Sequence, residues 1–514
     1  MTSIASSRAR SRNGRRWSRP RGCALNKDEL TLSSHAASNA RRPLDRVTHD
    51  IARYISDYCV ESEAALDSAC LCLIDTLGCA LEGLTIPECR KLLGPIVPDT
   101  IVPHGARVPG TSFELDPVKA AFDISCMARW SDFSDTYFGA QGSHPSDNIG
   151  GLLALADHRS RILQAGGKAP LLMREVLAAI VQAYEIQGVL SMDNSLYGVG
   201  LDHALLVKVA SAGVATRLCG GDREAVANAV TNAWIDGHSL CIYRRSPHAG
   251  TRKSWAGADA TARGVFLAML AVRGEMGYPS ALTTPTWGLY DVLFKGKPFA
   301  IPVTYGCSVV QNIQFKVSVP TVFNAQTAAE CAIRLHPVVR DRIQEIRKIT
   351  ICAHATTLRL NTASGPLATA AERDHCVQYV VAVGLLNGSI TAEDYETEAA
   401  SDPRIDALRA KTEILEDPAY TRDYADPAKR ASANAVQVFF ADGSTTEKVA
   451  VEYPLGHARR RAEAQKLLWE KFEANLARAF ADKQRKRIVA TCRDRESLER
   501  LAVHEFVALF LPQD

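Results

Sequence analysis

Long apolar segments separated by short polar breaks fill the first half of the chain, and their spacing predicts helices. Residues 62–84, 171–190, 204–219 and 255–273 are rich in Ala, Leu and Val, and each is bounded by Gly, Pro, Asp or Asn. Several of these segments are apolar on nearly every face, which indicates helices buried among other helices. From Leu44 to about Gly274 the pattern therefore predicts a large all-helical domain.

The pattern changes after Pro279. Residues 346–353 alternate between apolar and polar side chains as a strand does, and residues 315–320 are predicted to be extended. Residues 435–441 and 444–453 flank Asp442-Gly443, a strong signal for a β-hairpin. Helical patterns lie between these strands at 325–335, 374–386 and 402–411, and helices return at 460–479 and 498–511.

We therefore expect a mainly α protein with an α/β part. Residues 1–43 form a disordered basic segment, residues 44–310 the helical domain, and residues 311–453 a smaller α/β lid domain. Residues 454–514 are expected to return to the helical domain, so the lid is an insertion before the C-terminal helices. Pockets favour such domain junctions.

Composition narrows the class of protein. Sixty Lys and Arg against 57 Asp and Glu give a net charge of +3, which calls for no nucleic acid and no membrane as partner. The cysteines are scattered, and the chain has neither a C-x-x-C nor an H-E-x-x-H motif. This spacing predicts reduced thiols, no metal site and no cofactor.

The first 27 residues are rich in Arg and Ser and contain no acidic residue before Asp28. Such segments are typical of mitochondrial transit peptides. A disordered basic tail without a targeting role is the alternative, so the predicted location is the mitochondrial matrix or otherwise the cytoplasm.

Candidate chemistry gathers first in residues 127–160, a polar stretch between apolar segments. It holds Asp132, Thr136, Gln141 and His144. Ser146 or Asp147 is predicted to cap a helix that begins near Asn148, which would turn its N–H groups and positive dipole toward an anionic ligand. An ordinary capped helix after a polar loop is the simpler interpretation of this stretch alone.

Three further places add titratable or charged groups. His203 follows Asp202 at the start of an apolar helix, where a core histidine is the simpler interpretation. Lys316 stands alone between apolar neighbours, pointing either to solvent or into the cleft. A loop entering the helix near residue 255 is either a solvated basic loop or a pocket edge, and it contains Tyr243, Arg244, Arg245, Arg252 and Lys253.

Together these groups fit one kind of substrate. Several fixed cations can bind two or three carboxylates. His144 and His203 supply an acid and a base, in an order that the sequence leaves open, and Asp132 can orient or share a proton. A proton beside a carboxylate could then be removed and a β-hydroxyl eliminated, with a cation stabilising the charge that develops.

Six segments of the chain resemble the 2-methylcitrate dehydratases, among them ARWSDFSDTYFGAQGSHPSDNIGG, GLDHALLVKVAS, GTRKSWAGADATARG and RDHCVQYVVA. The superfamily of these enzymes also holds cis-aconitate decarboxylase. The resemblance implies a helical domain with an α/β lid, a homodimer, no iron–sulfur cluster, and dehydration of a tricarboxylate as in the methylcitrate cycle of propionate catabolism. Matching motif to motif, it implies active-site roles for Asp132, Thr136, His144, His203, Lys253 and Lys316.

The chain also departs from the pattern of that family. Gln141 and Gly142 stand where Glu and Trp are usual, Gln311 replaces a Glu, and Asn324 replaces a His. Gly142 in place of Trp predicts a larger pocket, and hence a substrate with a longer 2-alkyl group, as in fungal secondary-metabolite pathways. The same sequence is also compatible with a cis-aconitate-type decarboxylase and with a non-catalytic relative.

Overall fold

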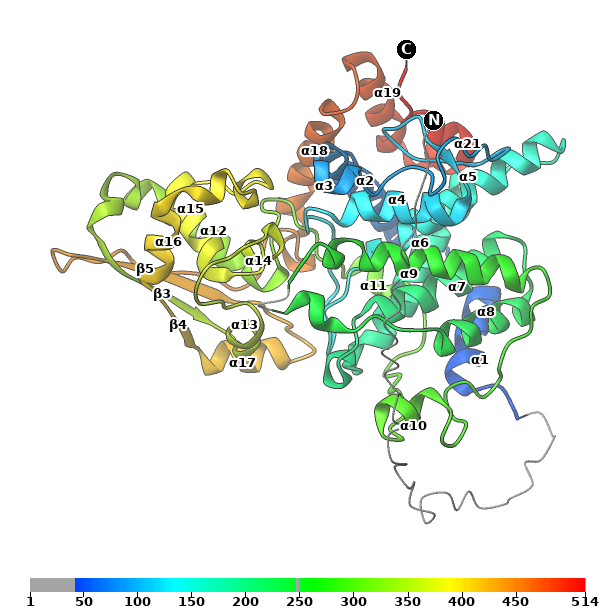
Figure 1. Cartoon of the computed structure of the whole chain (residues 1–514), viewed down its shortest axis with the longest axis horizontal. Coiled ribbons are helices and arrows are strands. Elements are labelled where there is room, and N and C mark those ends of the chain that lie inside the picture. Colours follow the sequence, from blue (N-terminus) through cyan, green and yellow to red (C-terminus); the bar gives the residue numbers. More distant parts are fainter. Residues whose placement is uncertain (1–41, 246–248, 514) are drawn as a thin grey trace, which may run out of the picture. The chain divides into compact units, whose positions relative to one another are not determined.

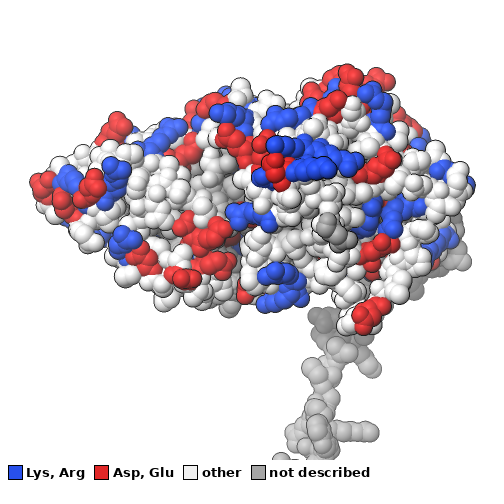
Figure 2. Space-filling view, turned by 90° about the horizontal axis from the view of Figure 1, so that it is seen from above, with Lys and Arg blue, Asp and Glu red and all other residues white. Residues whose placement is uncertain are grey.

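A computed structural model describes residues 42–245 and 249–513. Residues 1–41, which hold nearly all of the predicted basic segment, lie outside the described residues. Residues 43–514 form one compact unit, and the fold below is that of this unit. On the face drawn in Figure 2, Lys and Arg are interspersed with Asp and Glu, as expected for a chain of nearly neutral net charge.

Six helices pack around one large hydrophobic core. They are α2 (Glu63–Thr85), α4 (Pro117–Arg129), α5 (Ile149–Ala165), α6 (Met173–Met192), α7 (Ala204–Leu218) and α9 (Arg252–Ala271). Small residues allow close approach: a Cβ at Gly264 of α9 would lie 2.7 Å from the Cβ of Ser211 on α7. The four helices predicted from the apolar pattern are confirmed, with α9 beginning three residues earlier than expected. Shorter helices complete this part: α1 (Arg46–Asp57), α3 (Pro87–Arg90), α8 (Arg223–Ile235), α10 (Leu289–Phe294) and α11 (Ser308–Gln311).

Helix α2 is apolar along its whole length. Within the described part of the chain it is the one helix long and apolar enough to cross a bilayer, with a mean hydropathy of 1.6 over 18 residues. That window is 78% buried, because α2 packs against α4, α6 and the C-terminal helix α18 (Arg461–Ala477). The same length and composition describe the central helix of a helical core.

The α/β part is built on a four-stranded sheet with the order β4-β3-β5-β6. The strands are β3 (Ile346–Ala353), β4 (Thr412–Glu416), β5 (Asn434–Phe440) and β6 (Val449–Val451). Strand β3 pairs with β4 in parallel and with β5 antiparallel, and β5 pairs with β6 antiparallel. The predicted strand at 346–353 and the hairpin are confirmed, with Gly443 in the turn at φ +86°.

Helices cover both faces of this sheet. Figure 1 shows α12 (Gln326–Val339), α15 (Val377–Asn387) and α16 (Pro403–Ala410) on one side, and α13 (Ala355–Leu360) and α17 (Pro418–Ala425) on the other. Helix α12 packs on β5 and β6, and α13 packs beside β4. The short α14 (Ala370–Arg373) precedes α15. The buried side chains of these strands and helices form a second hydrophobic core within residues 319–451.

The C-terminal helices belong to the first core. Helix α18 packs on α2, and α19 (Asp482–Arg493), α20 (Arg495–Arg500) and α21 (Val503–Ala508) follow it. The single helix predicted at 498–511 is wrong, because extended backbone at Leu501 and Ala502 separates α20 from α21. Helix α19 and a two-stranded ribbon of β1 (Ala106–Arg107) and β2 (Glu114–Leu115) were not predicted from the pattern. The domain limits at 310/311 and 453/454 stay a prediction.

The start of α5 also differs from the prediction. A 3-10 helix, η2 (Pro145–Asn148), leads directly into α5, and Asn148 keeps helical angles of φ −77° and ψ −28°. Because the backbone does not become extended there, neither Ser146 nor Asp147 folds back to cap the helix. Their side chains are therefore left for other contacts.

Candidate functional site

A small pocket lies where the helical core meets the α/β part; we call it the histidine pocket. The helical core contributes Arg129, Asp132, Gly142, His144, Tyr197, His203, Arg244 and Arg245. The α/β part contributes Val322, Phe323, Asn324, Leu360, Asn361 and His375. Its volume of about 40 Å³ leaves room for only a few water molecules, so a larger ligand requires the two sides to separate.

His144 is held by the backbone of the loop that precedes it. Its Nδ1 lies 2.7 Å from the carbonyl oxygen of Asp135 and 3.3 Å from Oγ1 of Thr136. A carbonyl only accepts, so Nδ1 carries the proton and Nε2 keeps a lone pair. Burial, together with the positive charges of Arg129 and Lys316, holds the pKa of His144 well below its usual range. His144 is thus a neutral imidazole with a free acceptor.

His203 stands at the N-cap of α7, beside His144. The two rings meet edge to face, with centroids 5.3 Å apart and planes at 61°. Its Nε2 lies 3.2 Å from a terminal nitrogen of Arg244, which also forms an ion pair with Asp202. Burial lowers the pKa of His203 to about 3, despite the opposing charge of Asp202. Both imidazoles are therefore neutral in this form of the site.

Asp132 is the centre of the charged groups. Its backbone lies in the left-handed region at φ +49°, which is uncommon for a residue with a side chain. Arg129 forms an ion pair with its carboxylate, and Lys316 Nζ donates to its Oδ1 and its carbonyl oxygen, both at 2.7 Å. Although burial alone would raise the pKa of Asp132, these cations hold it well below the usual value.

Lys316 is fully buried, so of the two orientations that the sequence left open it takes the inward one. Burial lowers its pKa to about 8. The C-terminal helix α18 supports it from behind, because Lys471 Nζ donates to the carbonyl oxygens of Lys316 at 2.9 Å and Phe133 at 2.7 Å. Lys471 also binds Asp75 of α2 at 2.7 Å, so three distant segments fix this side of the site.

Two residues of the α/β part complete the site, and neither was predicted from the sequence. Asp374 forms an ion pair with Lys253, and Nδ1 of His375 lies 3.3 Å from the Lys253 ammonium. His375 lines the histidine pocket, with Nε2 4.0 Å from Oδ2 of Asp132. One sequence feature could have indicated these two residues: an Asp-His pair directly before an apolar helix, within the segment RDHCVQYVVA.

Asp132, Asp374 and His375 also bring three ligand atoms within 4.8 Å of one another, a geometry that could hold a metal ion. The charges argue for a different ligand. Arg129 and Lys316 neutralise Asp132, and Lys253 neutralises Asp374. A divalent cation would have to displace or face three fixed cations, whereas an anion would find donors already in place.

Several predicted residues do not line the histidine pocket. Thr136 is fully buried behind His144, and Gln141 accepts backbone hydrogen bonds from Leu196 and Tyr197 at 2.6 and 3.1 Å. Tyr243 is buried beneath the guanidinium groups of Arg244 and Arg252, 5.6 and 5.7 Å from its ring.

Arg252 is outside the pocket as well. Its side chain is 40% exposed, pairs with Asp259 at 3.4 Å and stacks on Trp255 at 4.2 Å. Its place in the first turn of α9 turns it to solvent, while the next residue, Lys253, turns inward. The predicted carboxylate-binding role of Arg252 does not fit this position.

The expected enlargement at Gly142 is not present. A Cβ at Gly142 would lie 2.7 Å from the ring of Phe323, so an aromatic side chain from the α/β part already occupies that space. Asn324 lines the pocket and donates to Asn361 at 2.8 Å. Gln311 lies outside it and donates to Ser62 at 3.3 Å, so its exchange for Glu does not touch the pocket.

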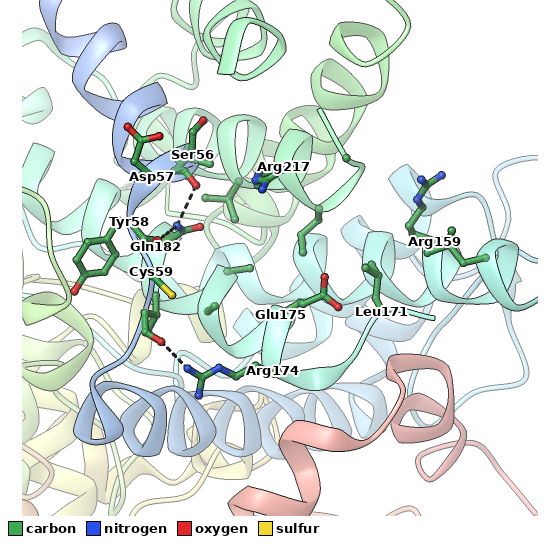
Figure 3. Close-up of a pocket in the computed structure, with 18 residues that line it drawn as sticks. Ser56, Asp57, Tyr58, Cys59, Arg159, Leu171, Arg174, Glu175, Gln182 and Arg217 are labelled. Carbon is green, nitrogen blue, oxygen red and sulfur yellow. Dashed lines mark hydrogen bonds between the residues drawn. The ribbon is translucent and has the colours of Figure 1, made fainter. Parts of the chain in front are cut away.

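A larger pocket of about 500 Å³ lies in the helical core and is shown in Figure 3. Two of its charged groups are tied to the fold: Arg174 donates to the carbonyl oxygen of Val60 at 2.6 Å, and Glu175 accepts from the backbone of Leu172 at 2.9 Å. Of the described residues that line it, none is a predicted site residue and none is a histidine. The candidate site is therefore the smaller pocket, which is lined by His144, His203 and His375.

Comparison with known proteins identifies the family. Residues 49–302 match the MmgE/PrpD N-terminal domain, and residues 319–495 match the MmgE/PrpD C-terminal domain. The chain belongs to the MmgE/PrpD family. The gap between the two matched ranges falls where the helical core passes into the α/β part.

Curated relatives in this family are named for one reaction. A 2-methylcitrate dehydratase of Salmonella typhi is 53% identical over 483 residues, covering 93% of this chain and 100% of the relative. A mitochondrial 2-methylcitrate dehydratase of Yarrowia lipolytica is 44% identical over 487 residues, covering 94% and 93%. A 2-methylcitrate dehydratase-like protein of Aspergillus oryzae is 42% identical over 480 residues, covering 91% and 96%. This MmgE/PrpD protein is an enzyme of the hydro-lyase class, as the resemblance implied.

Proposed function

We propose that this chain dehydrates 2-methylcitrate to 2-methyl-cis-aconitate by acid–base chemistry that its own side chains supply. The observation that carries the proposal is the pair of neutral histidines that line one pocket together with the guanidinium groups of Arg129 and Arg244. The 53% identity to a dehydratase over nearly the whole chain supports the choice of substrate. The pocket supports the choice of chemistry.

The cations would bind the carboxylates of the substrate. Each of four cations is bound to an Asp in this structure. Lys253 pairs with Asp374, Lys316 and Arg129 pair with Asp132, and Arg244 pairs with Asp202. A tricarboxylate would compete for the same donors, and opening the small pocket would release them. Charge-assisted bonds of this kind orient a planar carboxylate as well as hold it.

His144 is suited to act as the base. Its Nε2 is the free acceptor, so it can take the proton from the carbon beside a substrate carboxylate. The electron pair of that C–H bond forms the double bond, and the C–O bond to the β-hydroxyl breaks. Once a substrate carboxylate displaces that of Asp132, the ammonium of Lys316 would stabilise the negative charge that develops on the substrate carboxylate in the transition state.

His203 is suited to act as the acid that protonates the departing oxygen. It is neutral in the free pocket, and the negative charges of a bound tricarboxylate favour its imidazolium form. The proton on Nε2 would pass to the hydroxyl, which leaves as water. Proton exchange with solvent then restores both histidines.

The test is an assay of the full chain with 2-methylcitrate. We expect ultraviolet absorbance of a conjugated alkene to appear and mass spectrometry to find a product lighter by one water. Loss of CO₂ from cis-aconitate would instead make the chain a decarboxylase. No turnover of either acid, with binding unchanged in His144→Asn, would make it a non-catalytic relative.

The proposed function extends to assembly and location. We propose a homodimer, as the family resemblance implies. Light scattering after size-exclusion chromatography tests this.

We also propose the mitochondrial matrix as the location, because the Yarrowia relative is named mitochondrial and residues 1–43 are rich in Arg and Ser. Fusing residues 1–43 to a fluorescent protein in a fungal cell tests this, and diffuse cytoplasmic fluorescence would contradict it.

A further inference from the structure

Asp147 is a buried carboxylate that the proposed reaction does not use. Its side chain is 2% exposed, and neither of its oxygens has a hydrogen-bond partner among the described residues. Nε of Arg129 and Nδ1 of His203 are likewise buried and have no hydrogen-bond partner within residues 42–245 and 249–513. They lie 3.7 Å and 4.0 Å from the two oxygens of Asp147. Buried polar groups are rarely left unpaired, and when they are they often belong to functional sites.

The protonation of His203 explains which atom faces Asp147. Arg244 lies 3.2 Å from Nε2 of His203, and a guanidinium can only donate. Oδ1 of Asp202 is 3.6 Å from the same nitrogen, beyond hydrogen-bond length, so the closer contact with Arg244 makes Nε2 the lone-pair nitrogen of the neutral ring and places the hydrogen on Nδ1. Nδ1 is 4.0 Å from Oδ2 of Asp147, and a shift of about 1 Å would complete a hydrogen bond of ordinary length.

The fold leaves room for this carboxylate by a specific choice of residue. Gly257 lies in the interior of α9, where glycine is less favourable than alanine. A Cβ at Gly257 would overlap the carboxylate of Asp147. The absence of that atom lets the Asp147 side chain lie between α9 and His203.

We propose that Asp147 is the positioning residue of His203: it accepts the Nδ1 proton, fixes the tautomer whose Nε2 faces the pocket, and stabilises the imidazolium. This role rests on the proposed function, in which His203 is the acid. When Nε2 holds the proton destined for the leaving hydroxyl, both ring nitrogens are protonated, and Asp147 supplies the negative charge on the far side of the ring. It touches no reacting atom itself.

The charged groups around Asp147 set the direction of the expected effect. Arg129 faces it from α4, Arg244 from the 3-10 helix η4 (Cys241–Arg244), Asp202 and His203 from the start of α7, and Asp135 from the preceding loop. Burial raises the pKa of Asp147 to about 7, despite the positive charges of Arg129 and Arg244. The carboxylate is 4.0 Å from Nδ1 of His203, so removing its negative charge lowers the proton affinity of that imidazole.

The first experiment reads the tautomer directly and needs no turnover. In ¹⁵N-histidine NMR of the full chain, the His203 signals are assigned by their loss in His203→Asn. We expect His203 of the free protein to carry its proton on Nδ1, with the resonance of that proton at low field. In Asp147→Asn we expect this resonance to shift upfield. Asp157→Asn, a buried carboxylate of α5 that binds Arg107 at 2.6 Å, is the matched control and should leave it in place. A proton on Nε2 would overturn the proposal.

The second experiment uses the pH dependence of kcat/KM. In Asp147→Asn we expect kcat to fall about 10- to 100-fold, less than the roughly 10²- to 10⁴-fold cost of losing an acid itself, and the alkaline limb to move to lower pH. Gly257→Ala, which displaces the carboxylate without removing it, should act in the same direction. In a double-mutant cycle Asp147→Asn should cost nearly nothing once His203 is Asn. The role of Asp147 would be overturned if the alkaline limb of the kcat/KM profile did not move in Asp147→Asn. It would also be overturned if the losses in kcat of Asp147→Asn and His203→Asn were additive in the double variant.

These outcomes separate this inference from the proposed function. If the wild-type chain does not dehydrate 2-methylcitrate, the proposed function fails, whereas the NMR experiment still decides whether Asp147 holds Nδ1 of His203. If the chain is a dehydratase and the tautomer is the opposite one, only the inference about Asp147 fails.

Discussion

Lys253 of α9 forms an ion pair with Asp374, which lies 121 positions further along the chain, at the start of the segment that leads into α15. The ammonium and the carboxylate are 3% and 8% exposed, so both charges have been removed from water. The pair joins the helical core to the α/β part and at the same time holds a cation beside His375.

Breaking this pair should destabilise the protein. Lys253→Met leaves the buried carboxylate of Asp374 without its cation, and losses of this kind cost about 3–5 kcal/mol. In Lys253→Met/Asp374→Asn neither charge remains, so most of the stability should return while activity stays lost. Thermal unfolding and the dehydration assay measure the two properties. A Tm of Lys253→Met equal to that of the wild-type protein would show that the pair contributes nothing to the fold.

His144 offers the most direct test of the chemistry. His144→Asn keeps a donor near the carbonyl oxygen of Asp135 and removes the Nε2 acceptor. We expect kcat to fall by about 10²- to 10⁴-fold with a much smaller change in KM, because the group acts on the proton and not on the carboxylates. A variant that keeps more than about a tenth of the wild-type kcat would remove His144 from the role of base.

Replacing Arg244, at the end of η4, and Arg252, in the first turn of α9, should have very different effects on substrate binding. Arg244 is buried against Asp202 and His203, whereas Arg252 stacks on Trp255 in contact with solvent. Arg244→Ala should raise KM at least tenfold, since charge-assisted bonds contribute about 1.5–3 kcal/mol. Arg252→Ala should change kcat/KM less than threefold. The opposite order would mean that the basic loop rearranges when substrate binds.

The sequence predicted most of the helical core because its signals are local. Apolar residues over 204–218 repeat on every face, and only burial among helices satisfies such a pattern. The hairpin at Asp442-Gly443 is likewise specified by its turn residues. Helix α19 was missed because its face is strongly charged and it has only Gln484, Ile488 and Cys492 buried.

The site was predicted in part for a different reason. Asp132, His144 and His203 precede or begin apolar helices, and this local pattern was sufficient to select them. Asp374 and His375 share the same pattern but come from the α/β part, and nothing local indicates that they face Lys253. The roles of Arg252 and Gln141 depend on side-chain direction, and a loop sequence does not determine that direction.

Acid should destabilise the protein through its buried histidines. The pKa of His203 is about 3 when folded, against about 6.5 in an unfolded chain, so the unfolded state binds more protons between these values. The corresponding stability is fully present above pH 6.5 and is lost as the pH falls toward 3, by up to several kcal/mol. His203→Asn should flatten the decrease in Tm between pH 6.5 and 4.5, while His49→Asn, on the exposed surface of α1, should not. Parallel curves for all three proteins would contradict the effect.

Phe323 should limit the size of the alkyl group that the pocket accepts. Its ring lies 2.7 Å from the position of a Cβ at Gly142 and packs edge to face on Phe138, with centroids 5.2 Å apart. We therefore expect the wild-type chain to prefer 2-methylcitrate to 2-alkylcitrates with longer chains. Phe323→Ala removes the ring, so kcat/KM for a longer 2-alkylcitrate relative to 2-methylcitrate should rise about tenfold or more, since one methylene in a pocket is worth about 1–3 kcal/mol. Phe323→Leu keeps most of the volume and should keep the preference for methyl. A wild-type preference for the longer chain would mean that Phe323 moves away when substrate binds.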